Sequence, residues 1–187
     1  MLRNNLTKVD IFDNALGEIT KDDAHKNAVL HRAFSVFLYN SKKEILIQKR
    51  AENKYHSGGL WANACCSHPA IKENVVTSAQ NRLNEELGIC ANLKELFSFT
   101  YFYKFSDDLF EYEYDHVLLG KYDGEIYLNT DEASEYRWIS IDELNKELVD
   151  SPQKFASWFI ICAPQVASYL KHFDWHYQFF VIIYMYP

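Results

Sequence analysis

The fold of this chain follows from the stretch Glu73-Asn-Val-Val-Thr-Ser-Ala-Gln-Asn-Arg-Leu-Asn-Glu-Glu-Leu-Gly-Ile89. Its apolar residues recur three and four positions apart, the spacing of one helix face, at Val75, Val76, Ala79, Leu83 and Leu87. Gly88 follows directly, where a glycine commonly ends a helix. The stretch therefore predicts an amphipathic helix over 74–87, with Arg82 and Glu86 at the edge of its buried face.

Strands and shorter helices are predicted on both sides of this helix. Residues 9–12 and 18–19 are expected to form a small hairpin around Asn14–Gly17, and Thr20–Asp23 is typical of a helix N-terminus near His25. The other predicted strands span 31–39, 45–48, 97–103, 111–119, 125–128 and 137–139. The other predicted helices span 141–148 and 155–170, the second interrupted or bent near Pro164. This order predicts a mixed α+β or layered α/β/α domain.

The composition fits one globular domain and narrows its partners. A chain of 187 residues can bury a sizeable core, and no Pro-, Gly- or Ser-rich linker divides it. A net charge of -7 argues against nucleic acid or an anionic membrane as a general partner, so an anionic substrate needs a local basic cluster. Two of the four cysteines are adjacent and no signal segment precedes them, which favours reduced thiols in the cytoplasm.

The C-terminal segment Phe179–Pro187 is apolar but far too short to span a bilayer. Two interpretations stay open for it. It either packs as a terminal strand or helix end, or it forms an interface.

One group of side chains has the composition of a metal site. Imidazoles and carboxylates together suit a divalent transition metal, and carboxylates two positions apart on a strand share one face. A histidine or an acidic strand face found alone is more often an ordinary surface or core group than a metal ligand. The cysteine pair Cys65-Cys66 beside the third histidine adds a group suited to proton transfer. The predicted ligands are His25, His31, His68, Glu111 and Glu113.

The helical stretch also carries most of a known sequence pattern. It resembles the Nudix box, because Glu73, Leu83 and the tail Glu85–Ile89 stand at the spacing of that box. Ser67 replaces its first glycine, and Asn81-Arg82 replaces its Arg-Glu pair. Hydrolases of that superfamily have a carboxylate where this chain has the Arg82 guanidinium. The change weakens a hydrolytic metal site, and it provides a group that can contact a diphosphate.

The chain as a whole resembles type 1 isopentenyl-diphosphate isomerase, a family with the Nudix fold, in which helices flank a mixed β-sheet. The resemblance covers about residues 10–158 of a single expected domain 1–187 and leaves 164–187 unmatched. It rests on Lys21, His25, His31, Lys49-Arg50, Lys54, Asn63–Pro69, Arg82, Glu86, Tyr103-Lys104, Glu111–Glu113 and Phe155–Trp158.

The resemblance implies a reaction and its catalytic groups. Isopentenyl and dimethylallyl diphosphate interconvert through a tertiary carbocation, which needs a proton donor and acceptor on opposite faces and a pocket without water. By resemblance Cys66 and Glu113 fill these two roles, and Tyr103 contacts the catalytic glutamate. Trp61 and Trp158 are expected as aromatic walls that stabilise the cation.

The resemblance also implies how the substrate and metals are held. Lys21, Arg50, Lys54 and Arg82 match diphosphate-contacting positions, and Ser67 joins them as a substrate-binding residue. Glu86 is expected to bind magnesium that arrives with the diphosphate, while the three histidines and two glutamates take one zinc or manganese ion. The only partner expected is the isoprenyl diphosphate. A monomer is expected, and a dimer is left open.

Two rival functions remain at this point. One is a Nudix-type diphosphohydrolase, which the changed Arg-Glu pair disfavours. The other is a non-catalytic metal-binding or interaction module, which would have no reason to combine Cys66, Arg82 and Glu113.

Overall fold

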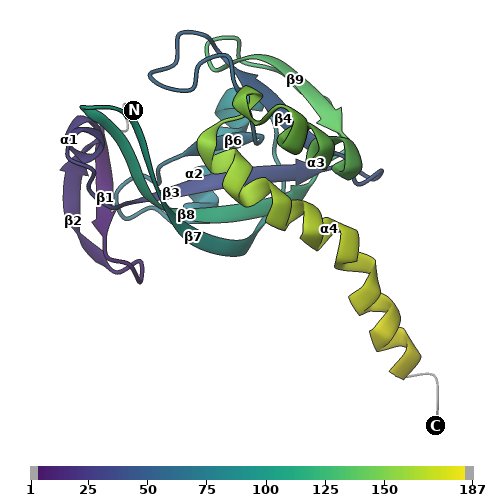
Figure 1. Ribbon diagram of the computed structural model, residues 1–187. Helices are drawn as coiled ribbons and strands as arrows, with labels where there is room; N and C mark the ends of the chain where they lie inside the picture. Colours follow the sequence, from purple (N-terminus) through teal and green to yellow (C-terminus); the bar gives the residue numbers. More distant parts are fainter. Residues whose placement is uncertain (1–3, 184–187) are drawn as a thin grey trace.

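The computed structural model describes the backbone of residues 4–183 and the side chains of residues 4–172. It contains one mixed sheet and four α-helices (Figure 1). The strands are β1 (Asn5–Val9), β2 (Ala15–Thr20), β3 (His31–Tyr39), β4 (Ile45–Arg50), β5 (Trp61–Ala62), β6 (Cys65–Ser67), β7 (Leu93–Ser106), β8 (Leu109–Lys121) and β9 (Ala133–Ile139). The helices are α1 (Lys21–Lys26), α2 (Val75–Leu87), α3 (Ile141–Asp150), the 3-10 turn η1 (Pro152–Lys154) and α4 (Ser157–Ile183).

Strand β3 is the centre of the sheet. It runs parallel to β8 and antiparallel to β1, β4 and β6. The long hairpin β7–β8 extends the sheet on one side, and β9 and β5 extend it through β4 on the other. Nearly all of β3 is buried, because elements pack on both faces of it.

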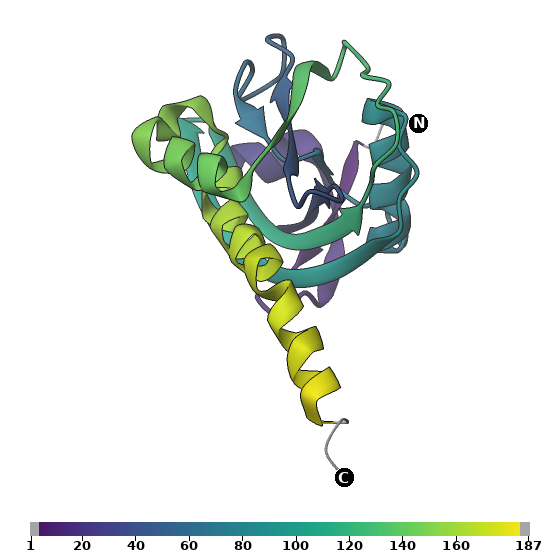
Figure 2. The same ribbon diagram turned by 90° about the vertical axis from the view of Figure 1, so that its right-hand side faces the viewer.

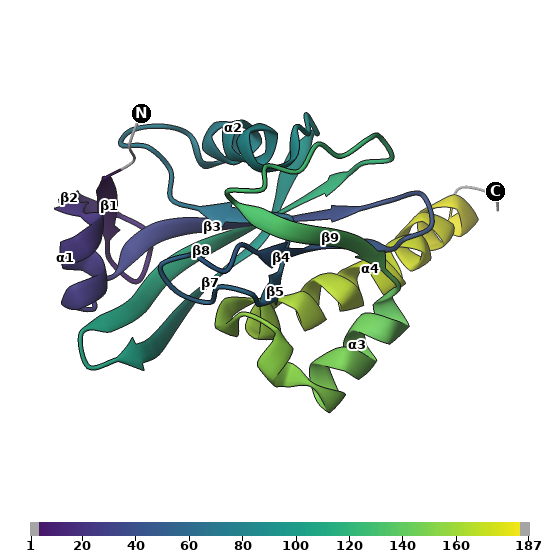
Figure 3. The same cartoon turned by 90° about the horizontal axis from the view of Figure 1, so that it is seen from above.

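Helices cover the two faces of the sheet in separate layers. Figure 3 shows α2 on one face and α3 with α4 on the other. On the α2 face, Phe34, Val36 and Leu38 pack with Leu83 and Leu87. The opposite core joins the other face of β3 and β4 to α3 and α4. The layered α/β/α prediction is confirmed.

Helix α2 forms as its sequence predicts. The Asn74 side chain accepts hydrogen bonds from the backbone N–H groups of Val76 and Thr77, which caps the N-terminus. At the other end Gly88 has φ 64°, a left-handed conformation that glycine adopts without strain. The apolar stripe is buried, and Glu86 lies at its edge within the core of the protein.

The N-terminal hairpin lies earlier in the chain than the sequence predicts. Its first strand ends at Val9, and residues 10–14 form the turn. The Asp10 side chain accepts hydrogen bonds from the backbone N–H groups of Phe12 and Asn14, which stabilises that turn. Consequently Ile11 and Phe12, expected in a strand, are 63% and 76% exposed.

The strand predicted at 125–128 is wrong. This segment pairs with the end of α2 rather than with the sheet: the Tyr127 N–H donates to the Leu87 carbonyl, 2.9 Å away. Ile126 and Leu128 pack on the α2 core, which explains the alternating apolar pattern without a strand.

The last helix is longer than predicted, and Pro164 does not interrupt it. Pro164 is exposed, while Cys162, Ala163 and Val166 beside it pack on the sheet, so this packing holds the helix through the missing N–H. Figures 1 and 2 show its final turns extending beyond the sheet. The backbone of 179–183 is helical, but how its side chains pack lies outside the described residues, as does all of 184–187. No helix in the described part of the chain is long and apolar enough to cross a membrane.

Candidate active site

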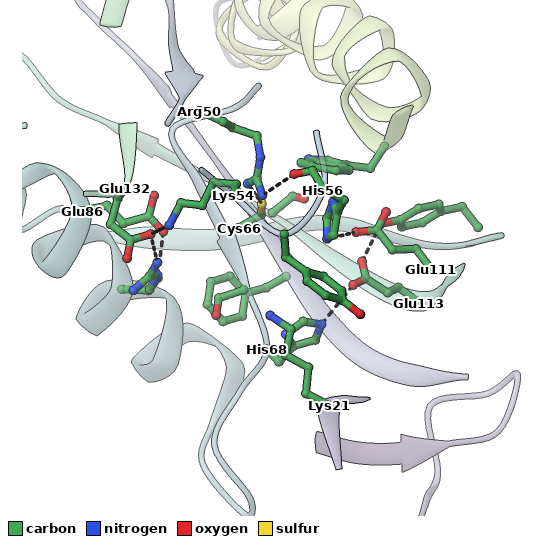
Figure 4. A pocket seen from close by; sticks show the side chains of 17 residues that line it. Lys21, Arg50, Lys54, His56, Cys66, His68, Glu86, Glu111, Glu113 and Glu132 are labelled. Carbon is green, nitrogen blue, oxygen red and sulfur yellow. Dashed lines mark hydrogen bonds and ion pairs between the residues drawn. The ribbon is translucent and has the colours of Figure 1, made fainter. Parts of the chain in front are cut away.

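The register of the sheet collects the chemically important side chains on one face. His31 of β3 is paired with Glu113 of β8, and Ser35 of β3 is paired with Cys66 of β6. Paired residues point to the same face, as do residues an even number of positions apart on one strand. Cys66 and Glu113 therefore lie on the strands to either side of β3, displaced along it, and both line one pocket (Figure 4).

Three histidines lie close to Glu113, and one of them, His68, lines this pocket. His31 Nε2 lies 3.2 Å from His68 Nε2, which lies 3.0 Å from Glu113 Oε1. With His25 they form a group whose ligand atoms all lie within 4.8 Å of one another. Helix α1 supplies His25, and it begins where the Thr20 side chain accepts from the Asp23 N–H, as predicted.

The hydrogen bonds of the histidines prepare them to bind a metal. Nδ1 of His25 donates to the Lys21 carbonyl, 2.7 Å away, and Nδ1 of His31 donates to the Val29 carbonyl, 2.8 Å away. Each bond leaves Nε2 as a bare lone pair, the form that ligates metals. The Nε2 of His25 is buried and has no hydrogen-bond partner. The donor set of imidazoles and carboxylates fits a divalent metal ion.

The fifth predicted ligand, Glu111, lies in a second group. It could bind a metal together with His25 and His56, so the two groups share His25. His56 Nε2 lies 3.1 Å from Glu111 Oε1, and the Tyr101 hydroxyl donates to Glu111 Oε2 at 3.0 Å. The structure thus divides the five predicted ligands between two groups that share His25, and it adds His56 to the second.

Burial and neighbouring groups shift the pKa values of the two glutamates of β8 in opposite directions. Burial and the nearby Glu113 carboxylate raise the pKa of Glu111 well above its ordinary range. Burial also raises the pKa of Glu113, but the His31 and His68 imidazoles beside it outweigh this and hold it well below its ordinary range. Glu111 therefore keeps its proton to higher pH than Glu113 does.

The tyrosine that contacts the acidic pair is Tyr101, not Tyr103 as predicted. The Tyr101 hydroxyl donates to Glu113 Oε2 at 2.6 Å as well as to Glu111, and its ring is buried. Tyr103 lies two residues nearer the hairpin end, is 43% exposed, and packs against Phe105. Its ring is turned toward a neighbouring groove, so it makes no contact with Glu113 in the structure.

Cys66 lines the pocket as a neutral thiol. Burial raises the pKa of Cys66 to about 12, although the Arg50 guanidinium opposes this shift. Arg50 Nη1 lies 3.8 Å from the sulfur. The thiol is therefore protonated near neutral pH and has a cation beside it. Cys65 faces away into the α2 core, as the alternation of a strand requires.

The basic side chains predicted to contact the diphosphate line the same pocket. Lys21, Arg50, Lys54 and Arg82 all do so, together with Ser67 and Glu86. Arg82 Nε lies 2.6 Å from Glu86 Oε1, and Gln48 donates to the other Glu86 oxygen at 2.9 Å. Burial raises the pKa of Glu86 although Arg82 opposes this.

Of the two predicted aromatic walls, only Trp158 reaches the pocket. Its indole is buried, donates to Asn63 Oδ1 at 3.0 Å, and lies beneath the Arg50 guanidinium. Trp61 is not among the residues that line this pocket, and its role as a wall stays a prediction. Trp61 lies on β5 and packs on the core beside α4. The Arg137 guanidinium lies over its indole, 4.8 Å from the ring centre.

Comparison with known proteins places this site in a family. The NUDIX domain model matches residues 29–159. Isopentenyl-diphosphate Delta-isomerase 2 of Aromatoleum aromaticum is 43% identical over 160 residues, 86% of this chain and 85% of its own. The enzyme of the same name from Photorhabdus laumondii is 44% identical over 154 residues, 82% of this chain and 87% of its own. The chain belongs to the isopentenyl-diphosphate Delta-isomerase family. The resemblance found in the sequence is confirmed.

Solved structures agree with this family on the fold alone. A protein of Deinococcus radiodurans superposes with a TM-score of 0.64 at 19% identity, covering 79% of this chain and 90% of its own. A MutT NUDIX hydrolase from Burkholderia pseudomallei superposes with a TM-score of 0.59 at 20% identity, covering 73% and 98%. The isomerase family thus shares its scaffold with hydrolases, and the site residues must distinguish them.

Among the residues that escaped the sequence interpretation are Tyr101, His56 and Glu132, which line the pocket, and Gln48, which contacts Glu86. Tyr101 and Tyr103 share one face of their strand, so alternation alone could not choose between them. His56 and Glu132 lie in irregular segments outside the strands, where no periodicity places them. Gln48 looked like an ordinary strand residue, and only its contact with Glu86 reveals its role.

Proposed function

We propose that the chain interconverts isopentenyl and dimethylallyl diphosphate with Cys66 and Glu113 as the two proton-transferring groups. The single observation that supports this most is their placement. The neutral thiol and the ionised carboxylate line one pocket from the strands on either side of β3. A flat alkene between them could receive a proton from one side and lose one to the other.

The protonation states support the assignment of roles. The Cys66 thiol holds its proton because it is buried, and Arg50 beside the sulfur stabilises the thiolate that donation leaves behind. Glu113 is ionised and can accept a proton. Tyr101 donates to Glu113 and fixes the direction in which the carboxylate points.

The pocket also suits the carbocation between the two proton transfers. The buried Trp158 indole presents a π system that favours a cation. Apolar packing behind it keeps bulk water from trapping the intermediate. Lys21, Arg50, Lys54 and Arg82 together supply positive charge for the diphosphate in a chain whose net charge is -7.

We propose that His25, His31, His68, Glu111 and Glu113 hold one zinc or manganese ion, and that Glu86 faces a magnesium ion bound to the diphosphate. A bound divalent ion would supply positive charge that keeps both glutamates ionised and oriented. The chain's own residues would still carry the proton transfers. We further propose that the protein acts as a monomer in the cytoplasm, where its four free cysteines would stay reduced.

A hydrolase on this scaffold is the competing function, and the α2 residues disfavour it. The Glu73 carboxylate is bound to Ser78 and Asn81 of α2 rather than exposed in the pocket. Glu85 is exposed, and Arg82 stands between it and Glu86. The carboxylates of the Nudix box therefore do not form one cluster.

Turnover in deuterated water tests the proposal. Purified protein, isopentenyl diphosphate and magnesium should give dimethylallyl diphosphate with deuterium in its methyl group. Release of phosphate without an allylic product would instead establish a hydrolase. Cys66→Ala should lose turnover by about 10²-fold or more while binding metal as before. Cys65→Ala, which changes the neighbouring thiol on the opposite face, should stay within a few-fold of the parent.

A further inference from the structure

The Glu132 carboxylate occupies the basic end of the pocket. It lies just before β9, and both Lys54 and Arg82 form ion pairs with the same oxygen, Oε2. Figure 4 shows Lys54 reaching toward Glu132 and Glu86 at this end of the pocket. Two cations from separate elements thus converge on one carboxylate oxygen, the arrangement that a phosphate oxygen would also accept.

Glu132 differs from its neighbour Glu86 in how firmly it is held. Glu86 is 3% exposed and is bound by both Gln48 and Arg82. The Glu132 side chain is 20% exposed, and it forms ion pairs with the flexible ends of Lys54 and Arg82. Glu132 is therefore the more exposed of the two carboxylates and the less firmly held.

The backbone of Glu132 is fixed although its side chain is not. Its carbonyl accepts from the Ala51 N–H at 3.1 Å, and its N–H donates to the Asn129 carbonyl at 3.0 Å. Ala51 begins the loop that carries Lys54. The carboxylate is therefore held in reach of both cations, and a side-chain rotation alone would remove it.

Arg50 shows the contrast within the same pocket. The Arg50 guanidinium contacts three neutral groups, which are the Cys66 sulfur, the His56 carbonyl and the Trp158 ring. A diphosphate can approach Arg50 without displacing a carboxylate. To reach Lys54 and Arg82 it must compete with Glu132.

We infer that Glu132 is the resident anion of the diphosphate subsite, which the substrate displaces from Lys54 and Arg82. The inference rests on the proposed role of these two cations. In the free protein the carboxylate keeps two like charges side by side without repulsion and so preorganises the subsite. It also lowers the affinity for the diphosphate, because its ion pairs must break before the ligand binds.

The Glu132→Gln variant tests whether the Glu132 charge lowers the affinity for the diphosphate. The glutamine oxygen can still accept from Lys54 or Arg82, but the competing charge is gone. Inorganic diphosphate titrated calorimetrically without magnesium should bind the variant about tenfold more tightly than the parent. Glu85→Gln is the matched control, since Glu85 pairs with the same Arg82 from outside the pocket, and it should change binding less than twofold.

A Lys54→Met variant distinguishes the two ways the inference can fail. If the parent does not bind diphosphate, or Lys54→Met binds it as tightly as the parent, the proposed subsite and the inference are both overturned. If Lys54→Met weakens binding but Glu132→Gln binds equally or more weakly than the parent, only the resident-anion role is overturned. Should Glu132→Gln fail to fold, Glu132→Asp replaces it. Its shorter side chain cannot serve both cations, so tighter binding again supports the inference and unchanged or weaker binding refutes it.

Discussion

Tyr101 and Tyr103 share a face of β7, yet only Tyr101 reaches the acidic pair. Tyr101 is opposite Glu113 and Tyr103 is opposite Glu111 in the hairpin register. We expect Tyr101→Phe to lower kcat about 10- to 100-fold, because Glu113 loses the hydroxyl that orients it. Tyr103→Phe should change kcat less than twofold. Steady-state kinetics on both variants, with metal content measured alongside, checks this, and equal losses from both would contradict it.

The residue types of the site were predictable from the sequence, and their exact partners were not. His25, His31, His68 and Glu113 lie close together, and Cys66 lines the same pocket as His68 and Glu113. Strand alternation explains the facing of Cys66 and Glu113. The choice between Tyr101 and Tyr103 depends on the curl of the β7–β8 hairpin, which no local pattern encodes. The choice between Trp61 and Trp158 depends on which side of β5 and α4 borders the cavity.

Elements formed as predicted wherever short-range chemistry determined them. Helix α2 has its cap residues in the sequence, and β3 has its buried apolar residues. Errors arose where tertiary contacts overrode the local pattern, as in segment 125–128, which packs on α2, and in α4, where packing carries the helix through Pro164. The expected single domain over 1–187 stays a prediction.

The hairpin β1–β2 positions α1, and a polar network holds it to the sheet. Arg32 of β3 donates to the Asp13 carboxylate and to the Asp13 carbonyl, both at 2.7 Å. His116 of β8 lies 3.1 Å from the same carboxylate and 2.8 Å from Glu95 of β7. Asp13 therefore joins the hairpin to β3 and β8, and His116 extends the network to β7. Helix α1 follows the hairpin directly and carries Lys21 and His25.

Removing this attachment should loosen one side of the metal site. We expect Asp13→Ala to lower the free energy of unfolding by about 1–3 kcal/mol, because Arg32 and His116 lose a partly buried partner. The affinity for zinc should fall several-fold, because His25 would be held less firmly in place. Glu18→Gln, on the outer side of the same hairpin, is the control. It should leave the free energy of unfolding and the affinity for zinc unchanged. Thermal unfolding and competition with a metal-sensitive dye measure these effects, and a destabilised variant with unaltered metal affinity would refute the link to His25.

At the scale of the whole molecule, buried ionisable groups make stability depend on metal and pH together. A metal ion that binds the folded chain and not the unfolded one stabilises it by mass action. We expect a chelator to lower the unfolding temperature, and His31→Ala to abolish that response. A melting temperature that a chelator leaves unchanged in the wild-type protein would argue against a metal in this site.

In the metal-free protein His68 and Asp115 make stability depend on pH in opposite directions, and above about pH 6.5 only the Asp115 effect remains. Burial lowers the pKa of His68 to about 4 from an ordinary value of 6.5. Between these values the unfolded chain takes up a proton that the folded chain refuses, so stability falls as the solution is acidified. Burial raises the pKa of Asp115 to about 8 from an ordinary 3.8, while the bond from Ser35 opposes this. Between those values the folded chain keeps a proton that the unfolded chain has lost, so stability falls as the pH rises toward 8.

Asp115→Asn tests the alkaline half of this dependence. The amide resembles the protonated acid in shape and can still accept from the Ser35 hydroxyl, but it does not titrate. Chemical denaturation of the metal-free proteins between pH 6.5 and 8 should therefore show a shallower loss of stability in the variant, by up to about 1.4 kcal/mol for each pH unit. The acidic limb, which depends on His68, should be unaffected. Parallel curves above pH 6.5 would mean that Asp115 is already ionised in the folded protein.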